Sequence, residues 1–332
     1  MKIKGLTITC VNDIKEDGAL CRYPENVYRK MKHEIACHMY GQEIRFRPLQ
    51  TVSITLSCLE KFEENKVEIY YGDHMLPHEV SFKEKVMLEI KPLKEMADQK
   101  LIDVFLEDYA YHPELVRIVL LSKRIRIDEV RGDFVDPQPG DCPEDRILVY
   151  GTSLSQGTST HLASLNYPSL LGRWLKMDVD NYSLAGQCLL EDYAVDFLSS
   201  LKEKYKLILF EPSTNLLAQG YTQEEFRAKV QYVLNSFRAA YPEALIVCLD
   251  LFESLFDHGV CGPFHLRSTP DEYRRALKTI VSEAQDEKIL LIETKTLLDR
   301  EDLSLDMMHP TSLGYFSIAS RLYEQVKERL NK

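Results

Sequence analysis

Residues 147–157 are ILVYGTSLSQG, an apolar run followed by a turn that begins and ends with glycine. An apolar run of this length, ended by glycine, is typical of a buried strand. Four further candidate strands follow, at residues 179–182, 207–210, 244–249 and 289–292. Longer amphipathic segments separate them. The alternation predicts an α/β fold, a doubly wound parallel sheet of five strands with helices on both faces.

The helices between these strands carry recognisable start signals. Thr222 with Glu225, and Thr269 with Glu272, have the spacing of capping boxes, in which the first side chain and the last satisfy amide groups at the helix start. Residues 312–330 repeat apolar side chains at helical spacing and predict a closing helix. These signals support the α/β prediction for the second part of the chain.

The first part of the chain has a different pattern of apolar residues. Short runs rich in Val, Ile and Tyr, separated by turn residues, lie at residues 52–59, 66–71, 86–90 and 116–121. They predict a β-sandwich, with one candidate helix at residues 26–38.

Three prolines and a glycine fall within residues 136–143, which favours a linker. We therefore expect two domains, a β-sandwich over residues 1–142 and an α/β domain over residues 143–332. A chain of 332 residues is long enough for two hydrophobic cores.

Charge and hydropathy argue against nucleic-acid-binding and membrane proteins. The formal net charge is −11 and no run of Lys and Arg is present, which argues against a nucleic-acid partner. No apolar stretch is long enough to span a membrane, and the start lacks a secretory signal, so a cytoplasmic protein without a membrane partner is expected.

The eight cysteines contain no CxxC pair and are interpreted mostly as buried thiols. His74 and His78 stand four residues apart, but Pro77 disfavours a helix there, so no metal site is predicted.

The turn at residues 151–157 places Ser153 at the carboxyl end of the first strand of the α/β domain, the edge where ligands bind in such folds. It is not a GxSxG elbow, because Ser155 stands where the second glycine would be. Considered alone, this turn is also compatible with a simple helix cap. A serine hydroxyl becomes a nucleophile only when a base removes its proton.

His309 is the best candidate for that base. Asp306 precedes it by three residues, and no other histidine in the chain has an acid three positions earlier. The pair follows the fifth strand, so it is expected at the same edge as Ser153, with Asp306 orienting the imidazole. His161 lies nearer to Ser153 in sequence, but it has no obvious orienting acid.

These residues resemble the SGNH, or GDSL, hydrolase superfamily. Four blocks occur in the superfamily's order: GTSLSQG at 151–157, NYSLAG at 181–186, EPSTN at 211–215 and DMMHP at 306–310. The resemblance covers about residues 146–330. It implies an α/β catalytic domain, and the GTS form of the first block is similar to a subgroup that carries an N-terminal sandwich of jelly-roll type, some members of which are carbohydrate esterases.

The resemblance also implies an oxyanion hole. The backbone amides of Ser153 and Gly186 and the side-chain amide of Asn215 would donate hydrogen bonds to the oxyanion, as the chemistry of acyl transfer requires. Two positions depart from the superfamily's pattern, Thr152 beside the serine and Leu216 after the asparagine, where aspartates are usual. Both leave the three candidate catalytic residues in place.

The predicted function is a serine esterase that cleaves a carboxylic ester, with a short acyl group such as acetyl on a carbohydrate as the expected substrate. It needs no metal or organic cofactor, and its partner is the small-molecule or carbohydrate ester, with the oligomeric state open. Two alternatives remain: an acyltransferase that uses the same serine, histidine and aspartate, and a non-catalytic carbohydrate-binding protein with the same fold. The aromatic loop at residues 252–267 either lines the pocket or anchors a small core.

Overall fold

The computed structural model describes residues 1–31, 34–60 and 65–330. The chain folds into two compact units. Unit 1 comprises Met1–Glu144, Leu162–Ser164 and Lys176–Asp180, and unit 2 comprises Asp145–His161, Leu165–Leu175 and Asn181–Lys332. The boundary placed between residues 142 and 143 stays a prediction. In the part of the chain that the structure describes, no helix has the length and apolar character that crossing a membrane requires.

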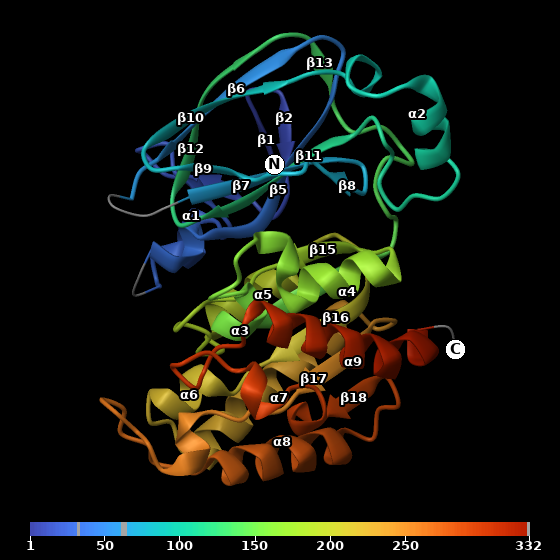
Figure 1. Ribbon diagram of the computed structural model, residues 1–332. Helices are drawn as coiled ribbons and strands as arrows, with labels where there is room; N and C mark the ends of the chain where they lie inside the picture. The colour runs from blue at the N-terminus through green and yellow to red at the C-terminus, as the bar shows by residue number, and fades with distance from the viewer. Residues whose placement is uncertain (32–33, 61–64, 331–332) are drawn as a thin grey trace. The chain divides into compact units, whose positions relative to one another are not determined.

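Unit 1 contains two main antiparallel sheets (Figure 1). The larger runs in the order β1 (Lys2–Ile3), β2 (Leu6–Ile8), β5 (Met39–Pro48), β11 (Val116–Ser122), β7 (Asn65–Tyr71) and β8 (His74–Met75), with β13 (Phe134–Val135) paired to β5 and β9 (Val80–Phe82) paired to β7. The smaller has β6 (Val52–Cys58) between β10 (Lys85–Ile90) and β12 (Ile125–Arg131). A separate hairpin joins β3 (Asp13–Ile14) to β4 (Leu20–Cys21).

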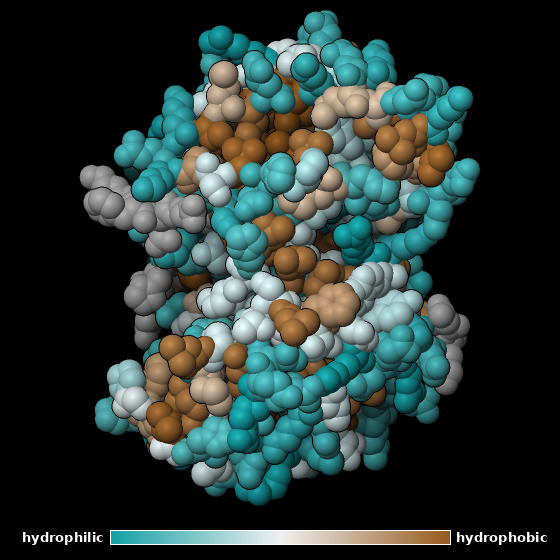
Figure 2. All heavy atoms as spheres, in the orientation of Figure 1, coloured by the Kyte–Doolittle hydropathy of each residue, from teal (hydrophilic) through white to brown (hydrophobic). Residues whose placement is uncertain are grey.

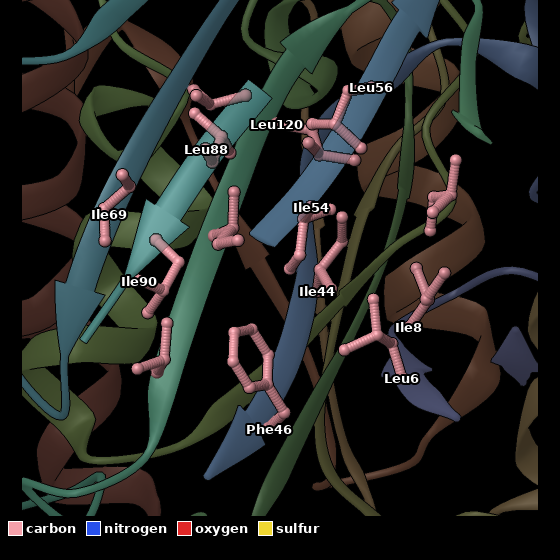
Figure 3. Packing of buried hydrophobic residues seen from close by; sticks show 14 of the residues in the cluster. Leu6, Ile8, Ile44, Phe46, Ile54, Leu56, Ile69, Leu88, Ile90 and Leu120 are labelled. Carbon is pink, nitrogen blue, oxygen red and sulfur yellow. The ribbon is translucent and has the colours of Figure 1, made fainter. Parts of the chain in front are cut away.

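The two sheets share one apolar core. Figure 3 shows Ile44 and Phe46 of β5 with Ile54 of β6 and Ile90 of β10, all fully buried or nearly so. Removing such side chains from water stabilises the fold by ~1.5–3 kcal/mol each. The predicted β-sandwich is therefore confirmed.

The helix predicted over residues 26–38 is wrong. Its described part holds only a short helix, α1 (Glu25–Tyr28), and a 3₁₀ turn, η1 (Glu34–Cys37), while residues 32 and 33 lie outside the described part. Three consecutive side chains of η1 are buried, a pattern that one stripe of an α-helix cannot provide. The remaining helical segments of unit 1 are η2 (Leu93–Glu95) and α2 (Gln99–Phe105).

The α/β region contains the predicted parallel sheet of five strands, in the order β15 (Asp178–Asn181), β14 (Arg146–Gly151), β16 (Tyr205–Glu211), β17 (Leu245–Leu249) and β18 (Ile289–Ile292). From β14 the chain adds β15 on one side, then returns to add β16 on the other. This reversal is a topological switch point, and ligands bind beyond the carboxyl ends of the strands there. The turns that follow β14 and β16 are therefore the expected place for a site.

Two sets of helices cover the sheet and make three layers (Figure 1). One set pairs α4 (Tyr167–Leu175) with α9 (Ser312–Leu330), and the other joins α5 (Asp192–Ser199), α7 (Gln223–Ala240) and α8 (Pro270–Ala284). Short helices α3 (Ser153–Gln156) and α6 (Thr214–Ala218) follow β14 and β16. The 3₁₀ turns are η3 (Ala163–Leu165), η4 (Leu255–His258), η5 (Thr294–Thr296) and η6 (Arg300–Asp302). Both predicted capping boxes are present, and the closing helix has the predicted bounds.

Candidate active site

Ser153 is the first residue of α3 and lies at the carboxyl end of β14. Thr152 caps the helix, since its hydroxyl accepts a hydrogen bond from the backbone N–H of Leu154 at 3.4 Å. A helix of four residues leaves the N–H of its first residue without an intrahelical partner, so the Ser153 amide is available to a ligand. The side chain of Ser153 borders the pocket described below.

The structure brings His309 and Asp306 to Ser153. His309 Nε2 lies 2.9 Å from Ser153 Oγ, and His309 Nδ1 lies 2.6 Å from Asp306 Oδ2. Partial burial acts to raise the pKa of Asp306, but hydrogen bonds from the His309 side chain and backbone and from Ser304 outweigh it and hold the pKa below its usual value. An ionised Asp306 keeps the hydrogen of the imidazole on Nδ1, which leaves the lone pair of Nε2 to accept from Ser153.

The loop that carries these residues is closed by its own backbone. The N–H of Ser304 donates to the carbonyl of His309 at 2.8 Å, and Leu303 pairs with Pro310 in an isolated bridge. Asp306 Oδ1 accepts the backbone N–H of His309 at 3.0 Å and the Ser304 hydroxyl at 2.7 Å. These contacts hold the imidazole in a fixed orientation, as proton transfer requires.

A pocket of about 350 Å³ opens beside Ser153 and His309. Its remaining lining residues are Thr158, Ala185, Gly186, Thr214, Asn215, Ala218, Gln219, Phe264 and Met308. Most of them present carbon atoms rather than polar groups. In Figure 2, hydrophobic residues gather over the region of unit 2 where Figure 1 places α6 and the loop before α8. The pocket is thus suited to an apolar group held next to a reactive hydroxyl.

Gly186 and Asn215 line the same pocket. Gly186 has φ +71°, a conformation that other residues adopt only with strain. The N–H of its neighbour Ala185 donates to Gln156 Oε1 at 2.8 Å, which ties this turn to α3. Asn215 Oδ1 accepts the N–H of Cys188 at 3.1 Å, which leaves the amide nitrogen as the group with which this side chain can donate to a ligand.

A buried carboxylate, that of Glu211, contacts the turn at residues 151–157, here called the nucleophile turn because it carries Ser153. Glu211 is fully buried at the end of β16 and accepts hydrogen bonds from the backbone N–H of Thr152 at 2.9 Å and from the Thr152 hydroxyl at 2.5 Å. Burial raises the pKa of Glu211 to about 7, although these hydrogen bonds act in the opposite direction. Sequence reasoning assigned no role to Glu211 or Gln156. The available signal for Glu211 was an acidic residue directly after a fully apolar strand segment, 207–210.

The other candidates lie elsewhere. His161 is exposed and does not line the pocket. His74 stacks on Phe105 with ring centroids 4.0 Å apart, and no cluster of three or more potential metal ligands occurs among residues 1–31, 34–60 and 65–330. Of the two alternatives for the aromatic loop, the first holds for Phe264, which lines the pocket, while Phe256 is buried and packs edge-on against Phe264 at 5.5 Å.

All eight cysteines are free thiols. Half of them are buried, which is fewer than the expected majority: Cys21, Cys37, Cys188 and Cys248.

Solved structures of similar fold cover nearly the whole chain. The salicylyl-acyltransferase SsfX3 from a tetracycline biosynthetic pathway superposes with a TM-score of 0.74 at 16% identity, over 98% of this chain and 95% of that chain. A family two carbohydrate esterase from Clostridium thermocellum gives 0.64 at 15% identity, over 98% and 99%. The acetyl xylan esterase Est2A from Butyrivibrio proteoclasticus gives 0.59 at 12% identity, over 100% and 96%. At such identities the likeness concerns the fold.

Sequence comparison is more specific for the α/β region. No curated protein matches the chain. A model of the GDSL-like lipase/acylhydrolase family matches residues 144–327, a range that includes both Ser153 and His309 and more than half of the chain. The chain therefore belongs to the GDSL-like lipase/acylhydrolase family.

Proposed function

We propose that the protein is a serine esterase in which Ser153 is the nucleophile, His309 the general base and Asp306 the residue that orients the base. The observation that carries this proposal is the unbroken hydrogen-bond chain from Ser153 Oγ to His309 to Asp306. Family membership supports the coarser statement, an acyl hydrolase or acyltransferase.

The reaction follows from this chain of contacts. Ser153 Oγ attacks the ester carbonyl carbon as His309 Nε2 takes its proton, and His309 then returns the proton to the leaving alcohol oxygen when the C–O bond breaks. Water attacks the acyl-serine, gives a proton to His309, and the acid leaves as that proton returns to Ser153. Asp306 stabilises the imidazolium that forms in each half of the cycle.

We further propose that the oxyanion is held by the amides of Ser153 and Gly186 and by the side chain of Asn215. All three residues border the pocket that contains the hydroxyl. Negative charge grows on the carbonyl oxygen during attack, so fixed donors at this point lower the barrier more than they improve substrate binding.

For the substrate we propose a short acyl ester of a carbohydrate, such as an acetyl ester. The support is the fold shared with carbohydrate esterases, one of them described as an acetyl xylan esterase. The small side chains of Ala185 and Ala218 leave room for an acyl group beside Ser153.

Acyl transfer is the second candidate. The observation that favours it is the apolar wall of Phe264 and Met308, which limits the polar surface that holds water around an acyl-serine. The salicylyl-acyltransferase of similar fold shows that this architecture also occurs in a transferase. Mass spectrometry of the products formed with competing sugars and alcohols separates the two: free acid alone contradicts transfer, and acylated acceptor as the main product contradicts hydrolysis.

A fluorophosphonate probe tests the nucleophile. The wild-type protein should become labelled, with the adduct on Ser153, and Ser153→Ala should not. Ser200→Ala is the control, because this exposed serine at the end of α5 donates its hydroxyl to the carbonyl of Phe197 at 2.7 Å and lies outside the pocket lining, so labelling should persist. Equal labelling of wild type and Ser153→Ala would rule out Ser153, and a folded wild type that resists the probe and hydrolyses no ester would favour the non-catalytic carbohydrate-binding alternative.

Phe264 should limit the size of the acyl group. We expect Phe264→Ala to raise the ratio of kcat/KM for p-nitrophenyl hexanoate to that for the acetate by about tenfold, which corresponds to the burial of about two of the four additional methylenes at ~0.8 kcal/mol each. Leu313→Ala serves as control, because this exposed residue of α9 lies outside the pocket lining. An unchanged acyl profile in Phe264→Ala would exclude this wall from acyl recognition.

A further inference from the structure

We propose that Glu211 is a positioning residue for the nucleophile: by holding Thr152, it fixes the backbone at Ser153 in the conformation that acyl transfer requires. This proposal rests on the function proposed above and adds a residue to it. Glu211 itself touches neither substrate nor reacting atoms.

The contacts converge on one oxygen of the carboxylate. Glu211 Oε2 accepts both the N–H and the hydroxyl of Thr152, and the Ser155 hydroxyl lies 3.2 Å from it. The donors thus come from the residue before Ser153 and from the second residue after it. A single acceptor therefore braces the nucleophile turn on both sides.

The strand register brings the carboxylate there. Gly151, the last residue of β14, is the direct partner of Glu211 across the two strands. A Cβ at Gly151 would lie 2.4 Å from Ser155 Oγ and 3.0 Å from Glu211 Cβ, so only glycine leaves room for this packing. The glycine at the start of the turn is explained by this close approach.

Thr152 connects Glu211 to the start of α3 through hydrogen bonds. Its hydroxyl donates to Glu211 and accepts from the N–H of Leu154, so the carboxylate sets the orientation of the helix cap. Fixing Thr152 and Leu154 fixes the peptide groups on either side of Ser153. The hydroxyl and the amide of Ser153 therefore keep their directions relative to His309 and the pocket.

The carboxylate is also a costly group to bury. Tyr167 of α4, Tyr315 of α9 and Cys188 lie close enough for its charge to add to burial in raising their pKa values, and among the described residues Glu211 forms no ion pair with a cation. A buried carboxylate without a cation reduces stability, and such groups are found preferentially at functional sites.

Ionisation of Glu211 should change how tightly the turn is held. A carboxylate accepts stronger hydrogen bonds than a neutral carboxyl group does. Because burial raises the pKa of Glu211 to about 7, the restraint should weaken as the pH falls through this value. Glu211→Gln has nearly the same shape, is neutral at every pH, and imitates the protonated form.

The test compares three variants by steady-state ester hydrolysis between pH 6 and 8.5. Glu211→Ala should lower kcat about 10- to 100-fold with little change in KM, because the turn loses its acceptor. The ratio of wild-type kcat to that of Glu211→Gln should be about 1 at pH 6 and rise to about 5 at pH 8.5. Asp250→Asn is the control, since Asp250 accepts the N–H and hydroxyl of Thr294 in the same way, and neither residue lines the pocket or contacts the turn at residues 151–157. The ratio of wild-type kcat to that of Asp250→Asn should not change between pH 6 and 8.5.

Thermal unfolding gives an independent readout. A raised pKa means that Glu211 contributes most stability below pH 4.5 and loses this contribution as the pH rises through about 7. The Tm of the wild type should therefore fall relative to that of Glu211→Gln over this window.

Three results would overturn the proposal: a kcat ratio independent of pH, an unchanged kcat in Glu211→Ala, or a kcat loss in Asp250→Asn equal to that in Glu211→Gln. Because fluorophosphonate labelling of Ser153 tests the nucleophile separately, its persistence alongside any of these results would leave the proposed esterase intact.

Discussion

Replacing His309 with alanine should lower kcat for ester hydrolysis by at least several hundredfold. The Ser153 hydroxyl would lose the acceptor that lies 2.9 Å away, and without it the proton must leave to water at a much higher free-energy cost. The measurement is kcat and KM for p-nitrophenyl acetate in wild type and variant. KM should change little, because the imidazole assists proton transfer rather than ground-state binding.

Added imidazole tests whether the activity of His309→Ala is lost because the base is missing. A small base that enters the space left by the side chain should restore part of the activity of His309→Ala, and it should not restore that of Ser153→Ala. His161→Ala is the matched control, and this exposed histidine should change kcat by less than about twofold. Undiminished hydrolysis in His309→Ala, or a large loss in His161→Ala, would show that the base is misassigned.

Strands β14, β16, β17 and β18 could be predicted because each contains a continuous apolar run, whereas β15 is mostly polar (DVDN). The segments 147–150, 207–210 and 289–292 fall within or coincide with β14, β16 and β18. A strand buried on both faces gives a continuous apolar signal, and parallel order brings the carboxyl ends together. That geometry is why Ser153 and His309, 156 residues apart, could be expected at one edge.

The β-sandwich was harder to locate strand by strand. Its longest strand, β5, was not predicted, because polar side chains interrupt its apolar residues. Two of them, Glu43 and Arg45, are buried and joined at 2.7 Å, and Arg117 of β11 completes the network at 2.8 Å from Glu43. Buried charged residues resemble a solvent-exposed face in sequence, because a partner on another strand, here Arg117, cannot be recognised along the chain.

The same limit applies to the site. Asp306 and His309 are separated by only three residues, so their pairing could be predicted from local spacing. The contact between Glu211 and Thr152 joins positions 59 residues apart and depends on the register of β14 and β16. Sequence patterns predict which strands are neighbours more readily than which residues face each other.

Replacing Asn215 with alanine should lower kcat by about 100- to 1000-fold, the usual effect of removing one oxyanion donor. Its Oδ1 accepts the N–H of Cys188, so the amide nitrogen, a neutral donor, is the group of this pocket-lining side chain that can serve the oxyanion. Because negative charge appears on the carbonyl oxygen only during attack, the loss should fall on kcat rather than on KM. Steady-state kinetics with an aryl acetate measures both.

Asn215→Asp separates the lost donor from a disturbed fold. Aspartate keeps an oxygen for the Cys188 N–H, whereas alanine leaves that buried N–H without its acceptor and should lower the Tm. If the donor matters, Asn215→Asp should lose at least as much kcat as Asn215→Ala while keeping more of the thermal stability, because its carboxylate also repels the developing charge. Gln219 provides the comparison, since it carries a second carboxamide in the same pocket. Gln219→Ala should raise KM rather than lower kcat. A kcat for Asn215→Asp close to that of the wild type would exclude Asn215 from the oxyanion hole and leave only the backbone amides of Ser153 and Gly186 in that role.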